Sequence, residues 1–123
     1  MSAFAFVHGA CFALTLALSP IAETPLPIDS GRYVFEHRYA EHPDVPSIRL
    51  DTIINGFDIV LINDDDSGVF PKGVIDEGKL MWHAASGQWI VGHDRIDAAA
   101  PEVGGCSDGP AVIDLEKRIY WTC

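Results

Sequence analysis

Residues 47–63, Ser-Ile-Arg-Leu-Asp-Thr-Ile-Ile-Asn-Gly-Phe-Asp-Ile-Val-Leu-Ile-Asn, place an Asn55-Gly56 pair between two largely apolar runs. Both residues of such a pair tolerate the positive φ angles of a type I′ turn, whose twist matches that of paired strands. The run after the pair is apolar on both faces, whereas the run before it carries two charges on one face. We therefore predict a β-hairpin of residues 47–54 and 57–63, with the second strand central in its sheet.

The same period-two alternation extends to both sides of this hairpin. Upstream, aromatic residues and His37 alternate with more polar ones over residues 33–39, which predicts a half-buried strand. The Pro-rich residues 42–46 predict a loop. Downstream we expect short strands at residues 69–75, 79–84, 88–92, 111–115 and 118–123. Turns are expected at 64–68, 76–78, 86–87 and 116–117, and a long loop at 94–110 with a short helix within 94–100. Seven or eight short strands predict an all-β fold, a small antiparallel barrel or sandwich.

The first 22 residues have a different composition from the rest of the chain. Residues 12–18 form an apolar core that is too short to span a bilayer but is typical of a secretory signal peptide. We therefore expect residues 1–22 to be a signal peptide and residues 23–123 to be one periplasmic or secreted domain without a membrane span. No Lys or Arg precedes the apolar core, so an N-terminal buried helix or strand is the alternative.

The formal charge of the chain is −10, and none of its charged residues lies within residues 1–22. A domain this acidic repels phosphate backbones, which excludes nucleic acid as an expected partner. The same field raises the rate at which basic proteins are encountered, so we expect a basic protein partner. The alternative is that the charge serves solubility alone.

Two cysteines, Cys106 and Cys123, remain after removal of the expected signal peptide. An even number of cysteines in an exported chain predicts a disulfide. The bridge would tie the loop before the final hairpin to the end of the last strand. A zinc site is the competing interpretation, but no Cys or His lies close enough in sequence to complete one, and we expect neither a metal nor a cofactor.

Two motifs hint at other chemistry. Residues 63–68 offer oxygen-bearing side chains at alternate positions with Gly68 sixth, as in a calcium loop, but Val74 stands where the bidentate Glu belongs. A hydrolase needs a nucleophile with a base beside it, and Ser86 and Ser107 lie in turn sequences. We therefore expect no enzymatic activity. The four histidines of residues 23–123 show no ligand spacing and are expected to be surface or half-buried side chains.

The aromatic and acidic residues are the candidates for binding. Trp and Tyr are frequent at binding hot spots, and the three tryptophans fall on separate predicted strands. The acidic residues gather in the predicted turns 64–68 and 76–78. The predicted binding residues are Asp64, Asp65, Asp66, Asp76, Glu77, Trp82, Trp89 and Trp121. The alternative for the tryptophans is ordinary core packing.

No motif assigns the chain to a family. Its general architecture and compartment resemble the small periplasmic or secreted β-barrel proteins of bacteria that act by binding, among them lysozyme inhibitors and toxin-immunity proteins. That resemblance implies a binding protein, an inhibitor or immunity protein acting on a cationic secreted enzyme such as a cell-wall hydrolase. The alternatives are a carrier with an apolar pocket in the barrel and an envelope component that pairs through a strand edge.

Overall fold

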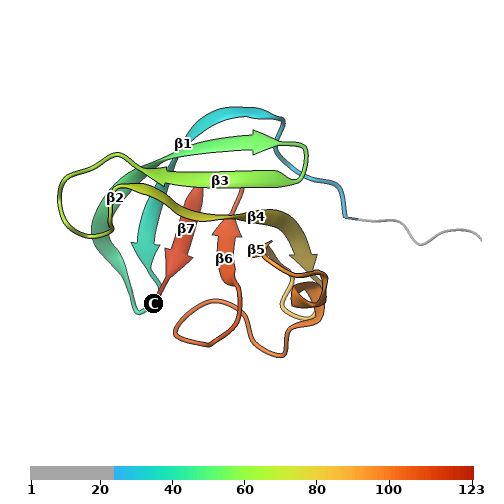
Figure 1. Ribbon diagram of the computed structural model, residues 1–123. Coiled ribbons are helices and arrows are strands. Elements are labelled where there is room, and N and C mark those ends of the chain that lie inside the picture. Colours follow the sequence, from blue (N-terminus) through green and yellow to red (C-terminus); the bar gives the residue numbers. More distant parts are fainter. Residues whose placement is uncertain (1–23) are drawn as a thin grey trace, which may run out of the picture.

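The computed structural model describes residues 24–123, so the expected signal peptide lies outside the described part of the chain. Seven strands form one closed barrel (Figure 1). The strands are β1 (Gly31–Tyr39), β2 (His42–Asn55), β3 (Asp58–Asn63), β4 (Gly73–His83), β5 (Gln88–Gly92), β6 (Ala111–Asp114) and β7 (Ile119–Thr122); a 3₁₀ turn, η2 (Arg95–Ala99), follows β5. The predicted all-β class is confirmed, as a barrel. Among the described residues no helix has the length and apolarity needed to cross a membrane.

Each strand pairs antiparallel with the next one along the chain, and β1 and β7 close the barrel as a parallel pair. The parallel pair follows from the number of strands. In an up-and-down arrangement the direction alternates, so an odd number of strands leaves the first and the last running the same way. The prediction of antiparallel pairing is therefore confirmed for every neighbouring pair except the closing one.

The hairpin of β2 and β3 is confirmed, with its turn one residue later than predicted. Asn55 pairs with Asp58, which leaves Gly56 and Phe57 as the two turn residues. Gly56 has a φ of 61°, and Phe57 is not among the residues with positive φ. Glycine at the first central position with ordinary φ at the second is the pattern of a type II′ turn. The aspartate after the turn therefore belongs to β3.

The loop predicted at residues 42–46 is wrong, because β2 begins at His42. Arg38 pairs with Pro46 and Tyr39 pairs with His42, so residues 43–45 bulge out of the ladder between these pairs. Proline has no backbone N–H to donate and is tolerated in a strand at such a bulge. The prolines therefore bend this strand and do not end it.

The turn predicted at residues 76–78 is also wrong, because these residues lie inside the continuous strand β4. Leu61 pairs with Asp76 and Ile62 with Val74, which leaves Ile75 as a bulge. The segment 64–72 is correspondingly longer than the predicted turn, and no strand begins at residue 69. A bulge increases the local twist of a strand, which is what closing a small barrel requires.

Large apolar side chains fill the barrel and also cover its two ends. Leu26 and Ile28 pack against the core from the segment that leads into β1, and Phe70 does so from the segment between β3 and β4. Figure 1 shows these two segments at opposite ends of the barrel. The buried core consists of Phe35, Ile48, Leu50, Ile54, Ile59, Leu61, Leu80, Trp89, Val91, Ile113, Leu115 and Tyr120.

A second apolar layer lies outside the barrel, beneath the long loop of residues 94–110. Ile90 and Val112 form a cross-strand pair on the outer face of β5 and β6, and they are 0% and 9% exposed. Gly104 of the loop lies so close to Val112 that an added Cβ would clash with its side chain. The long loop therefore acts as a lid on these strands.

The predicted disulfide between Cys106 and Cys123 is confirmed, with 4.6 Å between the two Cα atoms. It joins the long loop to the residue that follows β7, the strand that closes the barrel. The bond therefore fixes the loop and the closing strand at the same time.

Two of the histidines depart from the expected exposure, because His37 is fully buried and His83 is 2% exposed. His37 lies inside the barrel with Nδ1 2.6 Å from the hydroxyl of Ser47 and Nε2 2.6 Å from that of Thr122. The rings of Tyr39 and Phe70 pack edge-on against it. Burial lowers the pKa of His37 below its usual value of 6.5.

Candidate functional site

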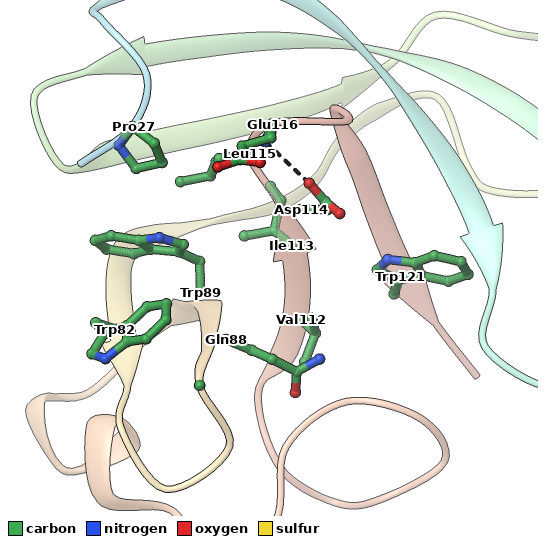
Figure 2. A pocket seen from close by; sticks show the side chains of 11 residues that line it. Pro27, Trp82, Gln88, Trp89, Val112, Ile113, Asp114, Leu115, Glu116 and Trp121 are labelled. Carbon is green, nitrogen blue, oxygen red and sulfur yellow. Dashed lines mark hydrogen bonds between the residues drawn. The ribbon is translucent and has the colours of Figure 1, made fainter. Parts of the chain in front are cut away.

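A groove of about 300 Å³ brings the three tryptophans together at the surface (Figure 2). We call it the tryptophan groove. Figure 2 shows Trp82 and Trp89 together on one side of Ile113, with Trp121 on the other side. Its lining residues are Pro27, Trp82, Gly87, Gln88, Trp89, Val112, Ile113, Asp114, Leu115, Glu116 and Trp121.

Strand alternation explains how the tryptophans reach this groove. Trp82 and Trp89 are directly opposite each other on β4 and β5, with ring centroids 5.5 Å apart and ring planes at 64°. Trp89 belongs to the buried core, while Trp82 packs against that core and remains partly exposed. On β7, Tyr120 points into the barrel, so its neighbour Trp121 faces outward. The groove therefore combines two inward-facing indoles and one outward-facing indole.

The acidic residues of the groove come from the turn between β6 and β7. Asp114 Oδ1 accepts hydrogen bonds from the backbone N–H groups of Glu116 (3.1 Å) and Lys117 (2.8 Å), so this carboxylate orders the turn. Glu116 is exposed, and within residues 24–123 its carboxylate forms no ion pair. The groove thus presents indole rings beside a carboxylate that is free to pair.

This combination suits a cationic group. The face of an indole attracts an ammonium or guanidinium group, and the attraction is worth about 0.5–2 kcal/mol according to how far the pair is desolvated. A nearby carboxylate adds charge-assisted hydrogen bonds, for which the planar guanidinium of arginine is the best-matched partner. Side chains of this chemical character are better suited to an arginine or lysine side chain than to an anion.

None of the acidic residues predicted for binding lines the tryptophan groove. Asp64, Asp65 and Asp66 lie in the segment between β3 and β4, where Asp65 Oδ1 accepts from Ser67 N at 2.9 Å and Asp66 pairs with Lys72 at 2.9 Å. Glu77 is exposed within β4. The fold therefore brings the three tryptophans to one groove, and the acidic residues predicted for binding lie outside it.

Asp76 has a different role from the one expected for a turn residue. Its side chain is 11% exposed, and Oδ2 accepts a 2.6 Å hydrogen bond from the hydroxyl of Tyr120. Oδ1 lies 2.6 Å from Nε2 of His93. Burial of Tyr120, reinforced by this hydrogen bond and by the charge of Asp76, raises the pKa of Tyr120. Asp76 therefore links two strands of the protein and has no free oxygen facing a partner in this arrangement.

Sequence reasoning missed Asp114 and Glu116 as site residues. Asp114 was expected within the strand of residues 111–115 and Glu116 in the turn after it. Their place in the same groove as Trp82 and Trp89 depends on β6 pairing with β5. The one signal available in the sequence was that Glu116 lies five positions before Trp121, in the turn that leads into the same strand.

The oxygen-bearing side chains that resemble a calcium loop form hydrogen bonds within the protein. Asn63 is 1% exposed, and its amide nitrogen donates to the carbonyl oxygens of Phe70 (2.9 Å) and Pro71 (3.1 Å). Its Oδ1 accepts from the backbone N–H of Asp65 at 2.9 Å. The side chain therefore closes the segment between β3 and β4 and ties it to the barrel.

Comparison with known proteins gives no match to a family model, to a curated protein or to a solved structure. The function therefore has to be argued from the groove and from the charge of the chain.

Proposed function

We propose that this protein is an exported binding protein that takes a cationic side chain of a basic partner into the tryptophan groove. The observation that carries the proposal is the meeting of Trp82, Trp89 and Trp121 with the unpaired Glu116 in one groove. The charge of −10 supports it because the field of the whole chain attracts a basic partner. The proposed role is that of an inhibitor or immunity protein for a basic secreted enzyme such as a cell-wall hydrolase.

The groove and the overall charge should contribute separately to binding, the charge to the association rate and the groove to the dissociation rate. Long-range attraction raises the association rate and is screened over about 8 Å at physiological salt. An aromatic-lined pocket filled by an arginine is instead a typical hot spot, and such contacts mainly control dissociation. We therefore expect salt to slow association while a change in the groove speeds dissociation.

Export is part of the same proposal. The disulfide supports it, because disulfides persist in oxidising compartments such as the periplasm and the extracellular space.

A carrier of small apolar ligands is the second candidate, and the edge-on pair of Trp82 and Trp89 favours it. Small-molecule pockets enclose about 300–1,000 Å³, and the tryptophan groove is at the bottom of that range. The filled barrel core argues for an open surface groove as the binding site. An apolar ligand that co-purifies with the protein would favour the carrier.

The test is a titration of the protein into a panel of basic cell-wall hydrolases while their activity is followed. We expect at least one enzyme of the panel to be slowed, with an affinity that falls about tenfold or more between 50 mM and 300 mM salt as the charges are screened. Unchanged activity for every enzyme at low salt would reject the proposed inhibitor.

A further inference from the structure

The turn between β4 and β5 places a serine hydroxyl against a buried imidazole. Nδ1 of His83 lies 2.7 Å from Oγ of Ser86, and Nε2 of the same ring lies 2.7 Å from the carbonyl oxygen of Ala100. A carbonyl oxygen can only accept, so Nε2 carries the ring proton and Nδ1 carries the lone pair. The hydroxyl of Ser86 therefore donates to His83.

This arrangement meets the geometric requirements for an activated nucleophile. It consists of a hydroxyl, a base within hydrogen-bond reach and a third group that fixes the tautomer of the base. The carbonyl oxygen of Ala100 is this third group; in serine proteases the third group is a carboxylate. The sequence analysis set Ser86 aside because it lies in a turn sequence; the fold places the buried His83 beside its hydroxyl.

The hydroxyl also faces a space that a substrate can occupy. A cleft of about 580 Å³ lies between the β4–β5 turn and the long loop. Ser86 is exposed in it, Pro101 and Val103 give it an apolar wall, and Gln88 and Ser107 also line it.

The turn itself does not require this hydroxyl. The backbone N–H of Gly87 donates to the carbonyl of His83 at 2.8 Å, and Gly87 adopts the positive φ of 69° that the turn needs. The backbone N–H of Ser86 also reaches Nδ1 of His83, at 3.2 Å. The alternative acceptor for the hydroxyl, the carbonyl of His83, is more distant at 3.4 Å. Removing Oγ should therefore leave the turn intact.

We propose that Ser86 is a nucleophile with His83 as its general base, acting on carboxylic esters with a small acyl group. Oγ of Ser86 bonds to the acyl carbon while its proton passes to Nδ1 of His83. The ester's alcohol leaves and takes that proton. Water then attacks the acyl-serine, giving a proton to Nδ1; the acid departs and the hydroxyl of Ser86 is restored. Neither Ser86 nor His83 lines the tryptophan groove, although Gln88 lines both cavities.

The test uses a fluorophosphonate probe on the purified full-length protein, with the labelled residue identified by mass spectrometry. The reaction forms a bond between Oγ and phosphorus, releases fluoride and transfers the hydroxyl proton to His83. We expect a single label on Ser86, none on the Ser86→Ala variant and unchanged labelling of the Ser107→Ala variant, which removes the other serine of the cleft. Ser86→Ala should keep the wild-type urea midpoint.

A second variant tests the role of His83. His83→Gln should slow labelling about 100-fold or more, the usual contribution of a general base. Because His83 is buried, that variant can lose its fold, so its urea midpoint is measured together with its labelling rate. The wild type supplies a comparison that does not depend on the variant. Labelling of wild-type Ser86 no faster than of the exposed Ser67 would overturn the proposal and leave Ser86 as a turn residue.

Discussion

Replacing Cys106 and Cys123 together by serine should lower the free energy of unfolding by about 3 kcal/mol. The bond closes a loop of 17 residues, and the chain-entropy model assigns that stabilisation to a loop of this length. Domains of this size have only about 5–15 kcal/mol of stability in total. The loss should therefore move the urea midpoint down by about 1–3 M.

The position of the bond gives this loss a structural consequence. The last strand, β7, pairs with β6 through Ile113–Tyr120 and Asp114–Ile119, and with β1 through Glu36 to Tyr39. Without the bond, its C-terminal end is held by backbone pairing with β1 and by the contact of the Thr122 hydroxyl with His37. Amide hydrogen exchange should accelerate first in β7 of the serine variant. Reduction of the wild type is the control, and it should reproduce the loss; an unchanged midpoint in both cases would contradict the entropic account.

Acidification should destabilise the protein through His37. Burial lowers the pKa of this imidazole in the folded state, whereas the unfolded chain keeps the usual value of 6.5. Below that pH the unfolded chain binds a proton that the folded protein does not, so stability is full above it and falls as the pH drops towards the folded pKa. The slope is at most about 1.4 kcal/mol per pH unit for one proton.

Urea unfolding at pH 7.5 and pH 5.5 measures this effect. The groups around His37 are the hydroxyls of Ser47 and Thr122 and the rings of Tyr39, Phe70 and Tyr120. His37→Gln should flatten the pH dependence, and His42→Gln, at an exposed histidine, should leave it as in the wild type. Equal slopes in wild type and His37→Gln would show that His37 is not responsible.

The sequence predicts most strands because their signals are local. Alternation over residues 33–39 and the Asn55-Gly56 pair each act within a few residues, and the structure confirms both strands and the hairpin. The errors at residues 42–46 and 76–78 have one cause. Proline and the Asp-Glu-Gly sequence are turn formers locally. In the closed barrel, however, residues 43–45 form a bulge within β2, and residues 76–78 pair with β3 directly after a bulge at Ile75.

The candidate sites were harder to predict because both depend on contacts between residues far apart in the chain. Glu116 lies beside Trp82 and Trp89 only because β6 pairs with β5. Ser86 and His83 are three residues apart. The hydrogen bond that sets the tautomer of His83, however, is made with Ala100, 17 residues further along the chain in the long loop. Local patterns contain no information about these long-range contacts.

The central claim, that the tryptophan groove binds a cationic side chain, can be tested by titrating the ¹⁵N-labelled protein with a tri-arginine peptide. We expect the indole N–H signals of the three tryptophans to shift together. Glu116→Lys should weaken binding at least about tenfold, because a charge-assisted contact worth about 1.5–3 kcal/mol becomes a repulsion. Glu77→Lys changes the net charge equally at an exposed position that does not line the groove, and it should weaken binding far less. Shifts centred on Asp64–Asp66, or equal losses in the two variants, would contradict the claim.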